Sequence, residues 1–380
     1  MAEKFRVVLT GGGSGGHIYP LLAVADILIK KSGELNFDEE LIYCGARDSY
    51  APLFEARGIR IVTIASGKLR RYFSLDNFLD IPKVFIGFIQ AFWKLYWLMP
   101  DVIFSKGGPG ALPVVIAGWF YRIPVAIHES DAIPGLTNTL SSRFARKIFL
   151  SFDAAAEKFG KGASKKITVV GSPIRTELLE HRSKSELAKG SLGFSSSHPL
   201  MLVLGGSQGS IRVNNFILTN LPAIVAITQV LHQTGAANFL EVQKLSHAAL
   251  IDTPATVNRY LPVNYFTDDY ATALEAADVV VARAGSGTTF EIAAFGKPAI
   301  LIPLSDAAND HQRANAYAFA EAGAAVVIEE SNLLPGIFLN ELNKVLTNSD
   351  VRKKMSEASA KFFTPGAAES IADEVMRMGA

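Results

Sequence analysis

The first strongly patterned stretch of the chain is Val7-Val8-Leu9-Thr10-Gly11-Gly12-Gly13-Ser14-Gly15-Gly16-His17, where an apolar run leads directly into a glycine-rich loop. A short Val- and Leu-rich run is typical of a parallel strand buried on both faces. Because glycine has no Cβ, the backbone N–H groups of such a loop can approach an anion or a sugar closely. The stretch therefore predicts a strand and a ligand-binding loop, followed by a helix that includes Leu21–Ile29.

The pattern restarts in the second half of the chain, where Leu202-Val203-Leu204 runs into Gly205-Gly206-Ser207. Between the two copies, Gly171–His198 contains turn-forming and polar residues that favour a break. We therefore expect an α/β protein with two Rossmann-like domains, 1–170 and 171–365. Ligands of such sheets bind beyond the carboxyl ends of the strands, where helices begin.

Alternation of short apolar runs with helical patterns predicts parallel strands connected by helices. Strands are expected at Arg6–Thr10, Glu40–Cys44, Arg60–Ile64, Val102–Ser105, Val125–His128, Lys147–Leu150, Lys166–Val170, Leu200–Leu204, Ala226–Gln233, Val257–Tyr260, Val279–Ala282, Ala299–Pro303 and Ala325–Glu329.

The composition of the chain argues against several classes of protein. The chain has 380 residues, a formal net charge of +1 and one cysteine, Cys44. The charge gives no basic field for nucleic acid, and one cysteine permits neither an internal disulfide nor a Cys-based metal site. The N-terminus does not resemble a secretion signal. The apolar stretch Val84–Met99 is shorter than the ~20 residues of a membrane-spanning helix and contains Lys94, so we expect no transmembrane helix.

Three polar groups in the glycine loops have both a chemical and a structural interpretation. His17 can act as a general base near neutral pH, or it can simply fix the loop. Ser207 can donate to a phosphate or sugar oxygen. The alternative is that Ser207 or Ser210 caps the next helix.

Arg283-Ala284-Gly285-Ser286-Gly287-Thr288-Thr289-Phe290-Glu291 follows another expected strand. The N–H groups of Ser286 to Thr289 could hold a diphosphate, and Glu291 could accept hydrogen bonds from ribose hydroxyls. The same spacing fits a capping box between Thr288 and Glu291. Downstream, Gln312 suits a sugar hydroxyl, or it belongs to a helix start capped by Asn309 or Asp310. His128 and Glu129 could equally be catalysts or a satisfied buried pair.

A basic, aromatic segment, Gly67–Phe73, precedes an apolar helical stripe formed by Phe85, Phe88, Phe92 and Leu95. Such a stripe normally packs into a core. A basic cluster beside exposed aromatic residues also suits anionic lipid headgroups. The second interpretation predicts membrane contact through Arg70, Arg71, Phe73 and Trp93.

Four motifs stand in one order along the chain: Gly12–His17, His128–Asn138, Gly205–Gly209, and Arg283–Thr288 with Glu291. From Val7 to about Gly323, the chain resembles the MurG family of bacterial peptidoglycan glycosyltransferases. The resemblance implies a GT-B fold, whose last helix, 366–380, crosses back to the first domain. It also implies an inverting hexosyltransferase that moves N-acetylglucosamine from UDP-GlcNAc to lipid I, the undecaprenyl-diphosphate-linked muramoyl-pentapeptide. The product is lipid II, used in cell wall biogenesis.

The resemblance implies no cofactor and no essential metal, with UDP-GlcNAc as a substrate. It assigns the second domain to the donor, and the first to the acceptor and the membrane surface. The protein is expected to be peripheral, at the cytoplasmic face of the cell membrane. The implied donor-binding residues are Ser14, Gly15, Gly16, Asp131, Arg175, Ser207, Thr267, Ser286, Gly287, Thr288, Thr289, Glu291 and Gln312.

Two positions depart from the family pattern. Asp131 stands where an asparagine is common, and a carboxylate can serve as a base, so the general base remains open between His17 and Asp131. Phe290 replaces a smaller residue. The remaining alternatives are another glycolipid glycosyltransferase of this fold, a UDP-GlcNAc 2-epimerase, and a non-catalytic nucleotide-sugar-binding protein.

Overall fold

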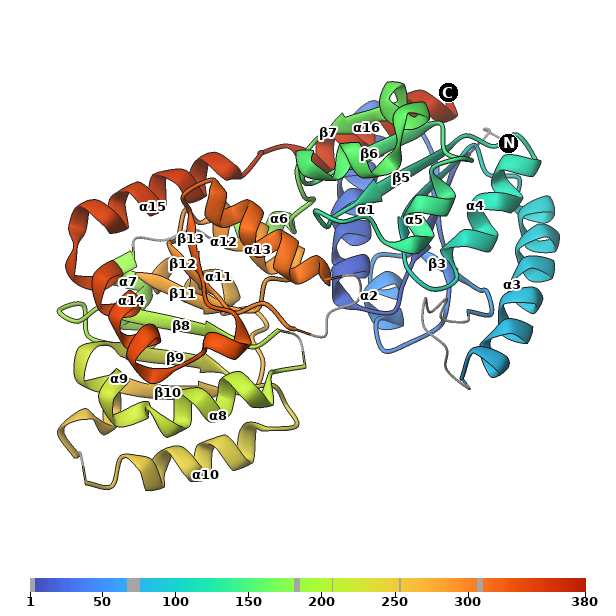
Figure 1. Ribbon diagram of the computed structural model, residues 1–380. Coiled ribbons are helices and arrows are strands. Elements are labelled where there is room, and N and C mark those ends of the chain that lie inside the picture. The colour runs from blue at the N-terminus through green and yellow to red at the C-terminus, as the bar shows by residue number, and fades with distance from the viewer. Residues whose placement is uncertain (1–3, 67–75, 181–184, 207, 253, 306–309) are drawn as a thin grey trace. The chain divides into compact units, whose positions relative to one another are not determined.

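The computed structural model describes residues 4–66, 76–180, 185–206, 208–252, 254–305 and 310–380. It divides into two compact units, one of residues 1–175 with 364–380 and one of residues 176–363. The boundaries expected from the sequence, after 170 and after 365, lie within a few residues of these positions. Each unit is an α/β layer built on a parallel sheet (Figure 1).

The first unit contains a seven-stranded sheet in the order β3-β2-β1-β4-β5-β6-β7. Its strands are β1 Phe5–Gly11, β2 Glu39–Gly45, β3 Arg60–Thr63, β4 Val102–Gly107, β5 Val125–Glu129, β6 Lys147–Leu150 and β7 Ile167–Val169. Its helices are α1 Gly15–Leu35, α2 Ala51–Glu55, α3 Asp76–Leu98, α4 Ala111–Phe120, α5 Leu136–Ser141 and α16 Ala367–Gly379.

Successive residues of β1 enter different cores because side chains alternate across a strand. Val7 and Leu9 pack under α1 and α16, whereas Val8 packs on the opposite face with residues of α3 and α4. Ile371 and Val375 lie on one stripe of α16 at helical spacing and are fully buried. Figure 1 shows α16 beside α1, so the end of the chain completes the first unit.

The second unit contains a six-stranded sheet in the order β10-β9-β8-β11-β12-β13. Its strands are β8 Leu200–Leu204, β9 Gln229–Gln233, β10 Tyr260–Val263, β11 Val279–Ala282, β12 Ala299–Leu301 and β13 Ala325–Val327. Its helices are α6 Thr176–Glu180, α7 Ser185–Ser191, α8 Ile211–Thr219, α9 Leu221–Ile227, α10 Phe239–Ala249, α11 Tyr270–Ala276, α12 Ser286–Ala294, α13 His311–Glu321, α14 Pro335–Thr347 and α15 Ser349–Phe362.

Two strand predictions in the second unit were wrong in position. The strand expected at Val257–Tyr260 lies at Tyr260–Val263, because a 3₁₀ helix occupies Pro254–Arg259. The strand expected from Ala226 begins at Gln229, because α9 continues to Ile227. Apolar runs have this ambiguity, since a buried helix end and a buried strand look alike in sequence.

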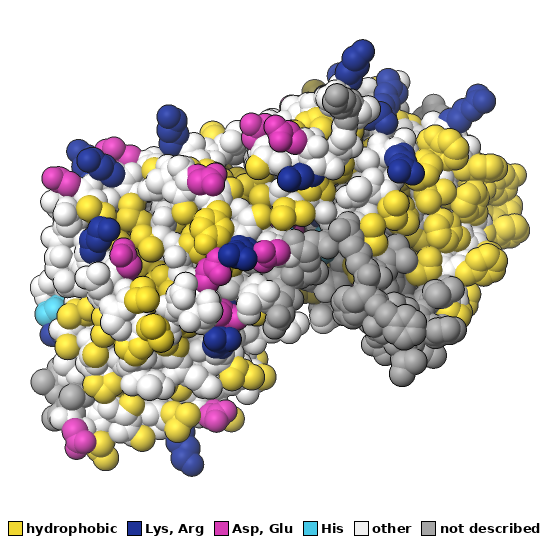
Figure 2. All heavy atoms as spheres, viewed as in Figure 1, with side chains coloured by type: hydrophobic (Ala, Val, Ile, Leu, Met, Phe, Trp, Pro, Cys, Tyr) yellow, Lys and Arg dark blue, Asp and Glu magenta, His cyan; other side chains and the backbone are white. Residues whose placement is uncertain are grey.

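Helix α3 carries the aromatic stripe seen in the sequence, and it has two different sides. Leu95 is fully buried under the sheet, whereas Phe85 and Trp93 are exposed, with 66% of the Trp93 surface accessible. Figure 2 shows hydrophobic side chains gathered over the face that α3 forms with α4. No helix among the residues described here is long and apolar enough to cross a membrane.

Candidate active site

Polar groups of the first unit meet beyond the carboxyl ends of three neighbouring strands, β1, β4 and β5. The loop Gly11–Ser14 follows β1 and leads into α1, which begins at Gly15. Gly12 and Gly13 have φ values of 148° and 91°, a conformation that favours glycine. A Cβ on Gly108, just after β4, would lie 2.4 Å from the carbonyl oxygen of Gly12. The two loops therefore pack backbone against backbone.

His17 lies in the first turn of α1, where Ser14 Oγ and His17 Nδ1 are 3.0 Å apart. The imidazole also faces the second loop, since a Cβ on Gly108 would lie 3.3 Å from its Nε2. His17 is half-buried and Ser14 is exposed. The geometry thus holds the ring by Nδ1, beside both glycine loops.

Glu129 ends β5, and its buried carboxylate organises the loop that carries Asp131. Oε1 accepts the N–H of Asp131 at 3.0 Å, and Oε2 accepts the N–H of Gly135 and Nδ2 of Asn138, both at 3.0 Å. Burial raises the pKa of Glu129, and the nearby charge of Asp131 adds to the rise. Glu129 therefore shapes the loop, and the half-buried Asp131 lies at its start.

His128 is not paired with Glu129, which corrects the expectation of a satisfied pair. Its Nε2 lies 3.2 Å from both the carbonyl oxygen of Gly171 and Oγ of Ser151. Burial, reinforced by the charge of Lys106, lowers the pKa of His128 well below its ordinary value. The ring is therefore neutral and ties β5 to the segment after β7.

Lys106 is a functional candidate that the sequence analysis missed. It is almost completely buried at the end of β4, and its Nζ contacts Oγ of Ser130. Burial lowers the pKa of its ammonium, while Glu129 and Asp131 act in the opposite direction. A lysine at the end of an apolar strand, directly before Gly107 and Gly108, was the available signal in the sequence.

Arg175 belongs to the first unit, at the point where the chain leaves it. Its guanidinium lies 4.5 Å from the centre of the Tyr19 ring, a cation–π contact on α1. Tyr19 follows His17 by two residues in the same helix. Arg175 is therefore placed near the helix that begins at the first glycine loop.

In the second unit, the helix α12 begins immediately after β11 with Gly285 as its N-cap. Ser286 and Thr288 both lie in its first turn, so the proposed capping box between Thr288 and Glu291 was wrong. A capping box needs its serine or threonine outside the helix. Gly285 provides no capping side chain, so no N-cap side chain occupies the N–H groups at this helix start, and phosphates favour positions of this kind in other proteins.

Glu291 lies one turn along α12 and is half-buried. Its Oε2 accepts a 2.9 Å hydrogen bond from the phenol of Tyr270, at the start of α11. The Phe266 ring stacks on Tyr270 with centroids 5.8 Å apart, and Thr267 next to it is exposed. The structure thus joins Phe266, Tyr270 and Glu291 by direct contacts at the start of α11 and the first turns of α12.

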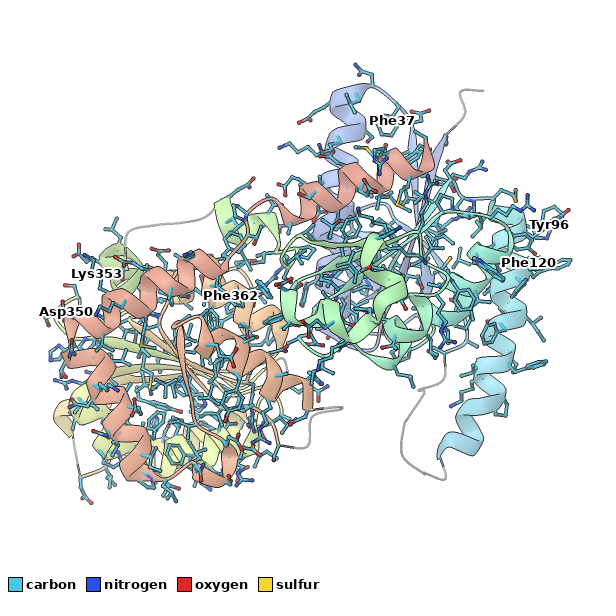
Figure 3. All side chains as sticks on the ribbon, turned by 45° about the horizontal axis from the view of Figure 1, so that its top comes forward. Phe37, Tyr96, Phe120, Asp350, Lys353 and Phe362 are labelled. Carbon is cyan, nitrogen blue, oxygen red and sulfur yellow. The ribbon has the colours of Figure 1, made fainter. Side chains whose placement is uncertain are left out.

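The other predicted residues have varied outcomes. Oε1 of Gln312 accepts the N–H of Leu304 at 3.1 Å, so its side chain folds back on the loop after β12. Ser210 is the N-cap of α8 and accepts the N–H of Val213, as one interpretation predicted. Phe290 faces the core and contacts Phe362, labelled in Figure 3. Ser207, Arg70, Arg71 and Phe73 lie outside the described residues.

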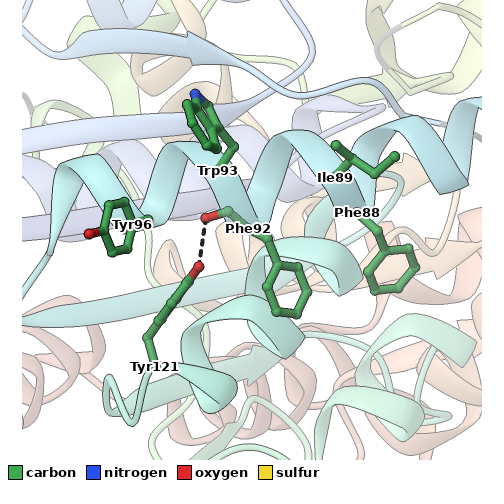
Figure 4. Close-up of a pocket in the computed structure, with 6 residues that line it drawn as sticks. All are labelled: Phe88, Ile89, Phe92, Trp93, Tyr96 and Tyr121. Atoms are coloured by element: carbon green, nitrogen blue, oxygen red, sulfur yellow. Dashed lines mark hydrogen bonds between the residues drawn. The ribbon is translucent and has the colours of Figure 1, made fainter.

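An apolar groove of about 550 Å³ lies on the first unit between α3 and the end of α4 (Figure 4). Phe88, Ile89, Phe92, Trp93, Tyr96 and Tyr121 line it. The phenol of Tyr121 donates to the carbonyl of Phe92 at 3.2 Å, which fixes one wall. Figure 3 shows Tyr96 and Phe120 projecting outward at this edge.

Comparison with known protein sequences shows the family of this chain. Residues 7–150 match the glycosyltransferase family 28 N-terminal domain, and residues 200–371 match the family 28 C-terminal domain. A Treponema denticola protein is 34% identical to this chain, and the match covers 97% of this chain and 96% of that protein. A Legionella pneumophila protein is 38% identical, and the match covers 90% of each chain. Both are named UDP-N-acetylglucosamine–N-acetylmuramyl-(pentapeptide) pyrophosphoryl-undecaprenol N-acetylglucosamine transferase.

Solved structures agree on the fold. Acinetobacter baumannii MurG aligns with a TM-score of 0.73 at 26% identity, covering 99% of this chain and all of that one. A UDP-GlcNAc 2-epimerase from Neisseria meningitidis, solved with UDP-GlcNAc bound, aligns at 0.70 with only 12% identity over 98% of this chain and 100% of the epimerase, a likeness of fold alone. Both units are thus those of a GT-B protein. The chain belongs to glycosyltransferase family 28 and, within it, to the MurG family of N-acetylglucosamine transferases.

Proposed function

We propose that this protein transfers N-acetylglucosamine from UDP-GlcNAc to lipid I, forming lipid II for peptidoglycan synthesis. Proteins named as N-acetylglucosamine transferases of this kind match more than nine-tenths of this chain. The observation that carries the proposal is the corner of the second unit where Tyr270 holds Glu291 beside the glycine-capped start of α12. An anion-binding helix start next to a fixed carboxylate suits a nucleoside diphosphate.

The donor would use that corner as follows. The N–H groups of Ser286, Gly287 and Thr288 face the diphosphate, where the helix dipole favours negative charge. Thr289, which was expected to share this role, is fully buried, and its N–H and hydroxyl both donate to the carbonyl of Gly285, at 3.0 and 3.1 Å. Glu291 accepts from the ribose hydroxyls, and Thr267 contacts uracil through its backbone. Ser207 and Gln312 would complete the site toward the sugar. Release of UDP then needs no metal in this account, because the backbone amides at the start of α12 offset the growing charge.

The first unit would provide the acceptor side and the base. Attack by the acceptor hydroxyl on the anomeric carbon expels UDP with inversion, and a base must take the hydroxyl proton. His17 and Asp131 are the two candidates near the glycine loops Ser14–Gly16 and Gly107–Gly110. Lys106 and Glu129 act indirectly, by holding the loop that carries Asp131.

Membrane contact is the second part of the proposal. The acceptor is lipid-linked, so the enzyme must work at a membrane surface, peripherally and at the cytoplasmic face. Exposed Phe85, Trp93 and Trp97 on α3 form an aromatic surface that suits the headgroup region. The basic residues Arg70 and Arg71 precede this helix in the sequence.

Acceptor-dependent release of UDP tests the proposed activity. Purified protein is mixed with UDP-GlcNAc, with and without a lipid I analogue, in the presence of EDTA. The proposal requires UDP release that depends on the analogue and persists in EDTA. Release that needs added metal, or that is equal without the analogue, would contradict it.

A further inference from the structure

Arg283 is a buried arginine that the donor-site proposal leaves without a direct role. It follows β11 and is only 7% exposed. Its NH2 donates to Oε1 of Glu330 at 2.5 Å and to Oγ of Ser210 at 2.8 Å, and its NH1 donates to the carbonyl of Ile302 at 3.0 Å. One guanidinium therefore joins segments that follow β8, β11, β12 and β13.

Glu330 extends the same network from the segment after β13, and it is also 7% exposed. Its Oε2 accepts the hydroxyl of Ser305, and Arg212 at the start of α8 lies 3.5 Å from the same oxygen. NH2 of Arg212 donates to the Glu330 carbonyl at 2.9 Å. Burial acts to raise the pKa of Glu330, but the hydrogen bonds from Ser305 and Arg283 outweigh it and hold the pKa below its ordinary value.

The joined segments are the ones that present the proposed donor groups. Strands β8, β11, β12 and β13 are neighbours in the sheet, so their carboxyl ends lie in one row. The loop after β8 contains Ser207, the segment after β11 opens α12, and the loop after β12 leads to Gln312. Nδ2 of Asn315 adds a 3.2 Å hydrogen bond from α13 to the carbonyl of Ala284.

Stability alone is a weak explanation for such a pair. Apolar residues of similar volume often replace a buried ion pair with no loss of stability, because both charges must be desolvated. What apolar residues cannot supply is the fixed fork of a guanidinium, which binds several oxygens in defined directions. The contacts of Arg283 use this property, since each of its three partners belongs to a different segment.

We infer that Arg283 and Glu330 form a positioning clamp, which sets the donor-binding loops of the second unit relative to one another without touching the donor. The inference rests on the proposed function, since it takes the nucleotide diphosphate as the ligand of these loops. It predicts that loss of the clamp weakens binding of UDP and leaves acceptor binding unchanged.

The test is a double variant, Arg283→Met with Glu330→Gln, which removes both charges and keeps similar volumes. Its control is Lys189→Met with Asp278→Asn. Lys189 and Asp278 form another ion pair of the same unit, at 2.6 Å, but at the amino edge of the sheet, where Asp278 accepts the N–H of Leu200. Calorimetry measures the dissociation constant of UDP, and steady-state kinetics measure both KM values.

The clamp variant is expected to bind UDP about tenfold more weakly than the control variant, with a matching rise in the donor KM and an unchanged KM for the lipid I analogue. Merely destabilised protein would instead lose active fraction, which lowers kcat and leaves the donor KM unchanged. Equal UDP affinities in the two variants would overturn the inference. Failure of the wild type to bind UDP would instead overturn the proposed donor site.

A milder variant keeps the test decisive if the double variant does not fold. Arg212 has a largely exposed side chain, and Arg212→Gln removes its ion pair with the Glu330 carboxylate and its hydrogen bond to the Glu330 carbonyl, while the Arg283–Glu330 pair stays. We expect a rise of about threefold in the UDP dissociation constant, which corresponds to part of one charged hydrogen bond. An unchanged constant would contradict the clamp.

Discussion

The phenol of Tyr270 donates a 2.9 Å hydrogen bond to Oε2 of Glu291, from the first residue of α11 to the first turns of α12. The bond fixes the carboxylate that we assign to the ribose. Tyr270 also stacks with Phe266, next to Thr267, so one residue contacts both the proposed ribose-binding carboxylate and the segment proposed to bind the base.

Tyr270→Phe should therefore weaken UDP binding about tenfold, because the carboxylate loses a charged hydrogen bond while the aromatic stack remains. Calorimetry with UDP measures the effect. Tyr317→Phe is the matched control, since Tyr317 donates a 2.8 Å hydrogen bond to Glu329 on an exposed surface of the same unit. Equal affinities for the two variants would remove Tyr270 from the donor site.

The base assignment predicts a separation of kcat from donor binding. Whichever of His17 and Asp131 takes the acceptor proton, its replacement by alanine should lower kcat by ~10²–10⁴-fold. UDP affinity should change little in His17→Ala, because its proposed role concerns the proton. Full activity in the double variant His17→Ala, Asp131→Ala would dispose of both candidates.

His232 predicts a pH-dependent stability in the second unit. Its Nε2 faces Oδ1 of Asn214 at 3.1 Å, its Nδ1 faces the phenol of Tyr260 at 2.9 Å, and burial lowers its pKa to about 3. The histidine in the unfolded chain, with a pKa of about 6.5, takes up the proton first. The contribution of His232 to the free energy of unfolding is therefore fully present above about pH 6.5. It falls by about 1.4 kcal/mol per pH unit as the pH drops from there toward 3.

Comparison with His232→Gln isolates this effect. Between pH 7 and pH 5 the wild type should lose about 2 kcal/mol more unfolding free energy than the variant. Hydrogen exchange of the β9 amides, corrected for intrinsic rates, reports on the right unit, since the tryptophans Trp93, Trp97 and Trp119 all lie in the first. Parallel pH profiles would show that His232 takes up its proton in the folded state.

Membrane contact predicts that the exposed side of α3 controls vesicle binding. The variant Phe85→Ser, Trp93→Ser should reduce partitioning onto phosphatidylglycerol vesicles about tenfold, because two large aromatic surfaces no longer leave water. Leu240→Ser is the control, since Leu240 is 77% exposed on the second unit. Equal loss in both variants, or none in either, would argue against this surface.

Local patterns predicted much of the fold. The apolar runs of β1 and β8 and the glycines after them are short-range features, and the structure has both strands with loops at the expected ends. The strand expected at Val257 begins three residues later, and the helix expected to start at Thr288 begins at Ser286. Neighbouring turns determine where a helix or strand begins, and the sequence leaves these boundaries ambiguous.

The site was less predictable where residues far apart in sequence determine it. Glu129 was expected as a catalyst or a pair with His128, yet its carboxylate accepts from Asp131, Gly135 and Asn138. Lys106 gained significance only when β4 brought it beside Ser130. Arg283 reaches Glu330 across 47 residues of chain. No periodicity encodes such contacts, because they depend on the order of strands in the sheet.

The most direct test of the central claim follows the sugar itself. Purified protein is incubated with UDP-GlcNAc labelled in its sugar and with a lipid I analogue, and the lipid and nucleotide fractions are separated. The account predicts label in the lipid fraction, with one UDP formed for each sugar transferred. Label that stays in the nucleotide fraction, as unchanged UDP-GlcNAc or as a 2-epimer formed without acceptor, would contradict it.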